Sequence, residues 1–249
     1  MTDTVISRQE GAIRWIGLNR PGCLNAMNGS LVADLTAALE HANADDETRV
    51  IVLYGEGRAF CSGDDLKEID DQTGSADDAF AWIDSIQNVT RLIMQSEKIV
   101  IAAVHGWCVG GALEWVINCD FRIFAEDARW FFPEVTWGLF VTGGVTALLT
   151  KHVGPQTAKE LMILGEKHDA EAAVKAGIAL KTCPTDMLHD EVLVLAAKII
   201  AKPPTSVADM KRAINTGFHA QLEQAMELET ELTVKGFLSS ESQARVKAF

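Results

Sequence analysis

The stretch that best indicates the fold of this chain is HGWCVGGALEWVINCD, residues 105–120. A short apolar run, KIVIAAVHG at 98–106, leads into it, and CDFRIFAED at 119–127 resembles that run. Short apolar runs closed by glycine are typical of buried strands, whereas VGGALEWVIN at 109–118 has helical spacing. The pattern predicts a strand, a glycine turn, a helix and a further strand.

The flanking sequence continues this alternation. AIRWIGL at 12–18 and RVIVLYGEG at 49–57 are expected to be strands, and residues 28–45 and 76–96 have the apolar spacing of helices. From residue 143 onward the segments that we interpret are all helical. Strands interleaved with helices and followed by a helical third predict an α/β fold with a helical C-terminal region.

Composition excludes several classes of protein. The 249 residues contain 22 Lys and Arg against 35 Asp and Glu, a net charge of −13, which argues against nucleic acid or an anionic membrane as the main partner. No apolar run is long enough to span a membrane, and the N-terminus lacks the pattern of a signal peptide. The His residues lack metal-ligand spacing, so no metal is expected. The five cysteines have no CxxC pairing, which favours reduced thiols and a cytoplasmic protein: Cys23, Cys61, Cys108, Cys119 and Cys183.

Two glycine-bearing segments follow predicted strands. GRAFCSGDDLKEI, residues 57–69, lacks the third glycine of a dinucleotide-binding fingerprint. In the second, Gly110 and Gly111 stand where a helix begins, and free backbone N–H groups there can bind an anion or oxyanion. Glu114 follows at one-turn spacing, beside whatever those amides bind. Each segment could instead be a tight turn with a packing role.

Glu134 lies in RWFFPEVTWG, residues 129–138, directly after a proline and among aromatic side chains. Such a carboxylate either points to water or is buried with a raised pKa. The first reading is structural and the second is a catalytic acid.

Four motifs together resemble one family: LNRPGCLNAM (18–27), GRAFCSGDDLKEI (57–69), the long stretch from Gly106 to Glu134, and LSSESQARVKAF (238–249). In order and spacing they are similar to the crotonase (enoyl-CoA hydratase/isomerase) superfamily, and closest to enoyl-CoA hydratases. The resemblance implies a spiral of ββα units over 1–195 and a helical oligomerisation region over 196–249. It also implies a homotrimer or a dimer of trimers.

The resemblance further implies a hydro-lyase of fatty acid metabolism, which adds water to a trans-2-enoyl-CoA. Backbone N–H groups of Asp64 and Gly111 would form the oxyanion hole, with the Asp64 side chain directed elsewhere. Glu114 and Glu134 would be the catalytic acid and base. The partner is an acyl-CoA thioester, and no separate cofactor is expected because coenzyme A is part of the substrate.

Binding residues follow from the same resemblance. Arg20 and Lys67 are the nearest cations for the phosphates, and Phe132, Trp137 and Thr142 would line the acyl pocket. The residues expected along coenzyme A are Arg20, Cys23, Leu24, Ala26, Ser62, Leu66 and Lys67.

The chain departs from the hydratase pattern after the second glutamate. Val141 and Thr142 stand where Pro and Gly are usual, and a glycine N–H there helps to hold the water. The aromatic neighbours suggest a bulky or aromatic acyl group. Alternatives are an enoyl-CoA isomerase, an acyl-CoA hydrolase, a hydroxycinnamoyl-CoA hydratase-lyase, or a non-catalytic acyl-CoA-binding subunit. The lyase reading is weakened because the one tyrosine, Tyr54, lies on an early strand.

Overall fold

The computed structural model describes residues 3–69, 73–217 and 219–247. Within them, the main sheet has the strand order β1-β2-β3-β4-β6-β9. The β1–β2 pair is antiparallel and the other neighbours are parallel. The strands are β1 (Val5–Glu10), β2 (Ile13–Leu18), β3 (Val50–Gly55), β4 (Ile99–Val104), β6 (Phe121–Ala125) and β9 (Lys181–Cys183).

A second, smaller sheet has the order β5-β7-β8, formed by β5 (Trp107–Val109), β7 (Arg129–Phe131) and β8 (His168–Asp169). We did not predict these strands, because two or three residues are too short to show a period-2 pattern. Their role is positional, since β5 leads directly into the glycine turn and β7 leads into Glu134.

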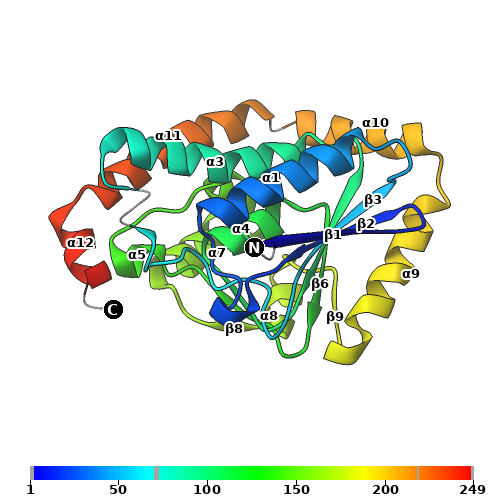
Figure 1. The fold of residues 1–249 in the computed structure, drawn as a ribbon, viewed down its shortest axis with the longest axis horizontal. Helices are drawn as coiled ribbons and strands as arrows, with labels where there is room; N and C mark the ends of the chain where they lie inside the picture. The colour runs from blue at the N-terminus through cyan, green and yellow to red at the C-terminus, as the bar shows by residue number, and fades with distance from the viewer. Residues whose placement is uncertain (1–2, 70–72, 218, 248–249) are drawn as a thin grey trace.

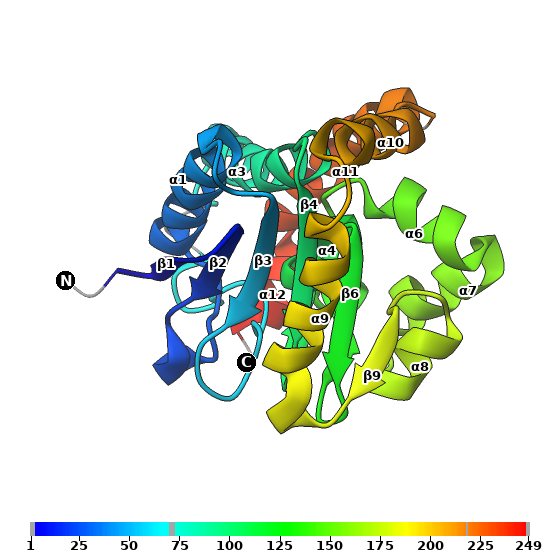
Figure 2. The ribbon, with the colours of Figure 1, turned by 90° about the vertical axis from the view of Figure 1, so that its right-hand side faces the viewer.

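Helices cover both faces of the main sheet. On β3, Ile51 and Leu53 belong to the large core beneath α1 (Gly29–Ala44), α3 (Ala76–Met94) and α4 (Gly111–Asn118). Val50 and Val52 face a smaller core beneath α9 (Leu188–Ile200). Figure 2 shows α9 on the side of the strands opposite α1 and α3. Alternate residues of one strand thus bury on opposite faces, which is why the strands read as continuous apolar runs.

The chain after β7 is helical apart from β8 and β9. Figure 1 shows α11 alongside α3 and α12 beside α5. Ser242 Oγ donates to the Gly138 carbonyl at 2.7 Å, which fastens α12 to the end of α5. These elements are α5 (Glu134–Trp137), α6 (Val145–Val153), α7 (Pro155–Lys159), a π-helical turn (Glu160–Leu164), α8 (Ala170–Lys175), α10 (Pro204–Thr216), α11 (His219–Phe237) and α12 (Ser240–Lys247), with 3-10 turns at Pro21–Cys23 and Thr185–Met187.

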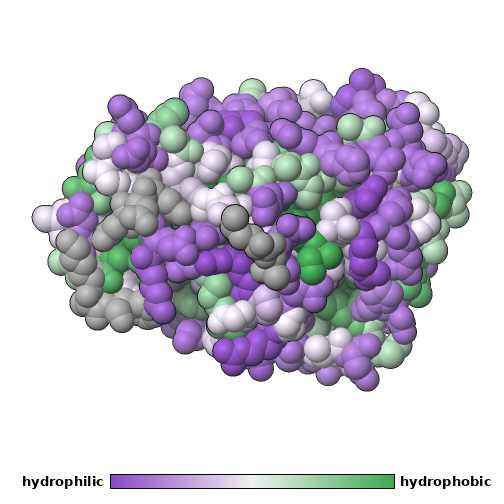
Figure 3. All heavy atoms as spheres, viewed as in Figure 1, coloured by the Kyte–Doolittle hydropathy of each residue, from purple (hydrophilic) through white to green (hydrophobic). Residues whose placement is uncertain are grey.

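The predicted α/β class with a helical C-terminal region is confirmed. The predicted boundary between residues 195 and 196 falls inside α9. Hydrophilic side chains cover most of the face seen in Figure 3, with apolar residues scattered between them. In the described residues, every helix is too short or too polar to cross a membrane.

Candidate active site

The site begins where two chain segments run side by side. Cys61 and Cys108 form an isolated parallel bridge, with Cys61 N donating to the Trp107 carbonyl at 2.9 Å and Val109 N to the Cys61 carbonyl at 3.1 Å. Asp64 lies three residues beyond the bridge on one segment, and Gly111 lies three beyond it on the other. The bridge therefore brings together the two predicted oxyanion-hole positions. Among the described residues, neither N–H donates to a backbone carbonyl of a turn or loop, while the Asp64 N–H lies close to its own carboxyl, whose pKa it lowers.

Glu114 lies one turn into α4 and is 1% exposed. Thr142 holds both of its carboxylate oxygens: the backbone N–H donates to Oε1 at 2.9 Å, and the hydroxyl makes a short hydrogen bond to Oε2. Burial raises the pKa of Glu114 to about 8, although both Thr142 contacts lower it. The structure therefore places a buried, doubly hydrogen-bonded carboxyl at the predicted position.

Glu134 is the first residue of α5, directly after Pro133, and it is buried. Its Oε2 has no hydrogen-bond partner in the described chain. Burial, and secondly the charge of Glu114, raise the pKa of Glu134 well above its usual range. Of the two readings of RWFFPEVTWG, the buried carboxyl is the one that the structure supports.

Gly110 explains how Glu134 reaches this position. Gly110 has φ +57°, and a Cβ added there would lie 2.6 Å from Glu134 Oε1. A residue with a side chain would both strain the turn and displace the carboxyl. The glycine pair thus provides a close approach between the α4 turn and the second glutamate.

Asp64 contributes a third carboxyl. That its side chain is directed elsewhere than the oxyanion position stays a prediction, and its charge raises the pKa of both Glu114 and Glu134. Burial raises the pKa of Asp64 itself to about 6, opposed by the nearby Trp82 indole and its own backbone N–H. No hydrogen bond joins Asp64 Oδ1 or Trp82 Nε1 to another described group. The site is therefore a cluster of three carboxyls with few donors.

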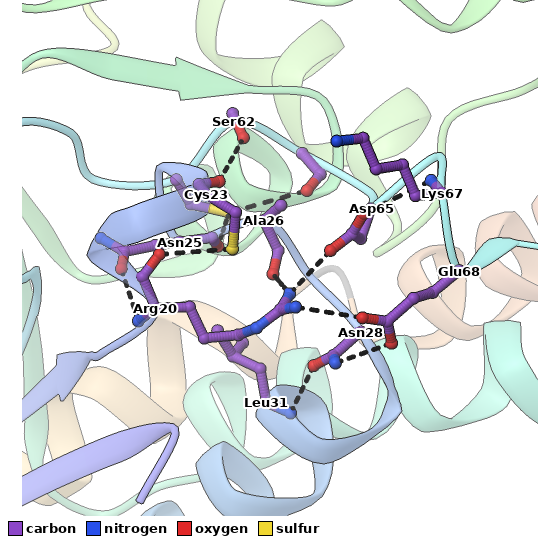
Figure 4. A network of polar contacts seen from close by, with 12 residues as sticks. Arg20, Cys23, Asn25, Ala26, Asn28, Leu31, Ser62, Asp65, Lys67 and Glu68 are labelled. Carbon is purple, nitrogen blue, oxygen red and sulfur yellow. Dashed lines mark hydrogen bonds and ion pairs between the residues drawn. The ribbon is translucent and has the colours of Figure 1, made fainter. Parts of the chain in front are cut away.

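Arg20 lies in the predicted coenzyme A region, but its guanidinium is already paired (Figure 4). It contacts Asp65 Oδ2 at 3.0 Å, Glu68 Oε1 at 3.1 Å and the Ala26 carbonyl. Arg20 therefore ties the 20–26 loop to residues 65–68, which limits its availability for a phosphate. Lys67 is exposed, and within the described residues its ammonium has no ion-pair partner.

The two predicted coenzyme A segments lie together. Ser62 N donates to the Leu24 carbonyl at 3.0 Å, and Ser62 Oγ to the Cys23 carbonyl at 3.5 Å. Cys23 is exposed, Leu24 and Leu66 are half-buried, and Ala26 is buried. The chain reverses here through left-handed residues at Leu24 (φ 54°) and Asn25 (φ 57°).

The predicted acyl-pocket residues differ in their surroundings. Phe132 is 1% exposed within the main core, and Trp137 is half-buried. Thr142 is the partner of Glu114, a role that our sequence reasoning missed. The sequence feature that could have indicated this contact is the VTGG turn before a helix. Local spacing does not reveal it, because Thr142 and Glu114 are 28 residues apart.

Metal binding finds no support in the described ranges, where no group of three or more His, Cys, Asp or Glu side chains is suited to hold an ion.

Comparisons with known proteins show the family of the chain. Residues 8–249 match the family model described as enoyl-CoA hydratase/isomerase. The chain is 32% identical to a probable enoyl-CoA hydratase of Rhizobium meliloti, over 99% of this chain and 95% of the relative. It is 31% identical to a crotonyl-CoA hydratase of Syntrophomonas wolfei, with the same coverage. A crystal structure of an enoyl-CoA hydratase/isomerase from Mycobacterium paratuberculosis superposes with a TM-score of 0.93 at 27% identity, covering 100% of this chain and 99% of that one.

Proposed function

The chain belongs to the enoyl-CoA hydratase/isomerase family, and we propose that it is a hydratase, which adds water across the double bond of a trans-2-enoyl-CoA. The observation that carries this proposal is the unequal environment of the two buried glutamates. Thr142 donates to both oxygens of Glu114, whereas Glu134 Oε2 has no partner in the described chain. Addition of water needs a base and an acid of this kind side by side.

Glu114 is the base of the proposed mechanism. Hydrogen bonds to a carboxylate favour its ionised form, and both Thr142 donors act on Glu114. Glu134 has no such side-chain donor, and ionised Glu114 further raises its pKa. The pair therefore loses its first proton from Glu114 and keeps the second on Glu134.

In the proposed reaction, Glu114 takes a proton from water while the water oxygen bonds to C3 of the enoyl group. The electrons of the double bond move toward the thioester carbonyl, and Glu134 delivers its proton to C2. The product has gained one water, and return of one proton from Glu114 to Glu134 restores the enzyme.

The developing enolate is assigned to the backbone N–H groups of Asp64 and Gly111. Their matching positions, each three residues beyond the Cys61–Cys108 bridge, support this role. One donor of this kind is worth about 3–4 kcal/mol in oxyanion holes. Lys67 is the proposed phosphate contact, and half-buried Trp137 supports a bulky or aromatic acyl group. We place the enzyme in the cytoplasm.

The test is incubation with a panel of trans-2-enoyl-CoA esters, followed by mass analysis. We expect a gain of one water and loss of the conjugated-enoyl absorbance. Glu114→Gln and Glu134→Gln should each lower kcat by at least about 100-fold, the lower end of the range for one acid–base group. Undiminished turnover in both variants would exclude the two-carboxyl mechanism.

An isomerase is the second candidate, and Thr142 favours it. The backbone N–H expected to hold water is instead occupied by Glu114. An isomerase needs no water, because one carboxyl moves a proton between C4 and C2. A 3-enoyl-CoA converted to its 2-enoyl isomer without a change in mass, and with no hydration, would support this alternative.

A further inference from the structure

Glu229 is a buried carboxylate in the middle of α11, far from the site in sequence. It is 1% exposed, and its oxygens accept hydrogen bonds from Gly144 N at 2.7 Å, Thr146 N at 2.9 Å and Thr146 Oγ1 at 2.6 Å. All three donors belong to the first turn of α6 or to the residue before it. The positive end of the helix dipole also favours a carboxylate there.

The turn that Glu229 holds is tightly packed against α11. Gly143 and Gly144 both have positive φ, +66° and +71°, and a Cβ at Gly144 would lie 2.0 Å from Leu222 Cδ1. Leu222 is itself on α11. One helix therefore fixes this turn through both a carboxylate and an apolar contact.

The same turn carries Thr142, whose two hydrogen bonds to Glu114 we call the Thr142 clamp. Thr142, which donates to both Glu114 oxygens, is two residues before Gly144. The Gly143 carbonyl between them accepts from Asn118 Nδ2 at 3.0 Å, and Asn118 lies one turn after Glu114 on α4. The segment is thus held from α4 on one side and from α11 on the other.

We propose that Glu229 is a positioning residue for the hydration reaction, which holds the 142–146 turn so that Thr142 keeps Glu114 in its reactive position. The inference rests on the proposed function of Glu114. It assigns α11 a part in the active site in addition to the oligomerisation role predicted for it.

The pKa of Glu114 is a measurable quantity that would not rise in a Glu229 variant if Glu229 only stabilised the fold. Burial raises the pKa of Glu229 to about 7, and its charge in turn raises the pKa of Glu114. The other carboxyls acting on Glu114 are Asp64 and Glu134, which remain in place in a Glu229 variant. Loss of the Glu229 charge by itself lowers the pKa of Glu114, whereas release of Thr142 raises it, and the Thr142 contacts are the larger influence.

The experiment compares Glu229→Gln with Glu229→Asp, and uses Glu227→Gln as the matched control. Glu227 is exposed on the same helix. We expect Glu229→Gln to lower kcat roughly 10- to 100-fold, as small misplacements of catalytic groups do, with KM changed less than about twofold. The acid limb of its pH profile should move to higher pH, because a displaced Thr142 no longer lowers the pKa of Glu114. Glu229→Asp should keep the wild-type limb, and Glu227→Gln should match the wild type throughout.

An activity-independent measurement separates this inference from the proposed function. In protein labelled with carboxyl-¹³C glutamate, the Glu114 signal is the one missing from Glu114→Gln. Its titration midpoint should rise in Glu229→Gln even if the wild type hydrates no substrate. A Glu114 midpoint that is unmoved or lowered in folded Glu229→Gln would overturn the inference, because Thr142 would then still hold Glu114.

Discussion

At Glu134, the proposed catalytic role and the stability of the fold are opposed. The residue is buried without a partner for Oε2, and desolvation makes its ionised form unfavourable. Its proposed role followed from the family resemblance, which places a second glutamate twenty residues after Glu114. The sequence did not reveal that its Oε2 lacks a hydrogen-bond partner among the described residues, because this depends on which groups surround it in three dimensions.

This opposition predicts how stability varies with pH. The folded state holds the protons of Glu114 and Glu134 more tightly than the unfolded chain, whose glutamates titrate near 4.5. Their contribution to stability is therefore complete below pH 4.5 and is lost as pH rises toward and through the folded values, by up to about 1.4 kcal/mol per pH unit for each proton.

Glu134→Gln removes one of these protons from the linkage. Relative to the wild type, its free energy of unfolding should increase between pH 5 and pH 8, measured by denaturant titration, while its activity is lost. Glu227→Gln, at an exposed position, serves as the control. A difference from the wild type that stays constant with pH would contradict the prediction.

Among the elements, the turn before α6 is the one that local patterns described least well. Its double glycine was visible, and Thr142 was recognised as a departure from the hydratase pattern. The bonds from Thr142 to Glu114 became visible in the folded chain, since they join α4 to a segment 28 residues away. Thr142, which stands where the hydratase pattern usually has Gly, thus has a hydrogen-bonding role of its own.

Thr142→Val tests that role by removing the hydroxyl and keeping the N–H. Because the Thr142 side chain lowers the pKa of Glu114, its loss should raise that pKa and move the acid limb of activity to higher pH. We expect kcat to fall about tenfold, the scale of one hydrogen bond to a charged group. Thr142→Ser keeps the hydroxyl and should retain the wild-type profile. A Val variant with an unshifted limb would argue against the clamp.

In the loop from Arg20 to Ala26, the role expected from the sequence differs from the contacts in the structure. Sequence reasoning placed two cations near the phosphates of coenzyme A. The structure shows Arg20 committed to Asp65 and Glu68, which leaves Lys67 as the freer charge (Figure 4).

Lys67→Ala should therefore raise KM for an acyl-CoA about 3- to 10-fold with kcat unchanged, since it removes binding shared by ground and transition states. The effect should weaken at high salt. Lys175→Ala, at an exposed position on α8, is the control and should leave KM unchanged. An equal KM in Lys67→Ala and the wild type would remove Lys67 from the binding site.

The whole molecule joins the sheet, the site and the C-terminal helices into one structure. α11 packs on α3 and α6, and α12 packs on α5, so the C-terminal helices contact the elements that carry the site. Apolar side chains nevertheless remain exposed beside α5, with Ile163 58%, Leu164 60% and Val135 45% exposed.

We predict that this chain forms a homotrimer or a dimer of trimers. Sedimentation at micromolar concentration should give three or six times the chain mass of 27.1 kDa. Replacing Ile163 and Leu164 together with serine should shift the population toward smaller species if these residues lie in the contact. A monomer in the wild type would contradict the prediction.

The sequence by itself determined the strands β2, β3, β4 and β6 with the helices between them, the glycine turn and the spacing of the two glutamates. These are local features, because backbone periodicity and turn geometry act over a few residues. Only the tertiary structure decided the partners of each charge: Thr142 for Glu114, the 65–68 segment for Arg20 and the α6 turn for Glu229. Such pairings depend on which distant segments exclude water together, and desolvation then sets the pKa of each carboxyl.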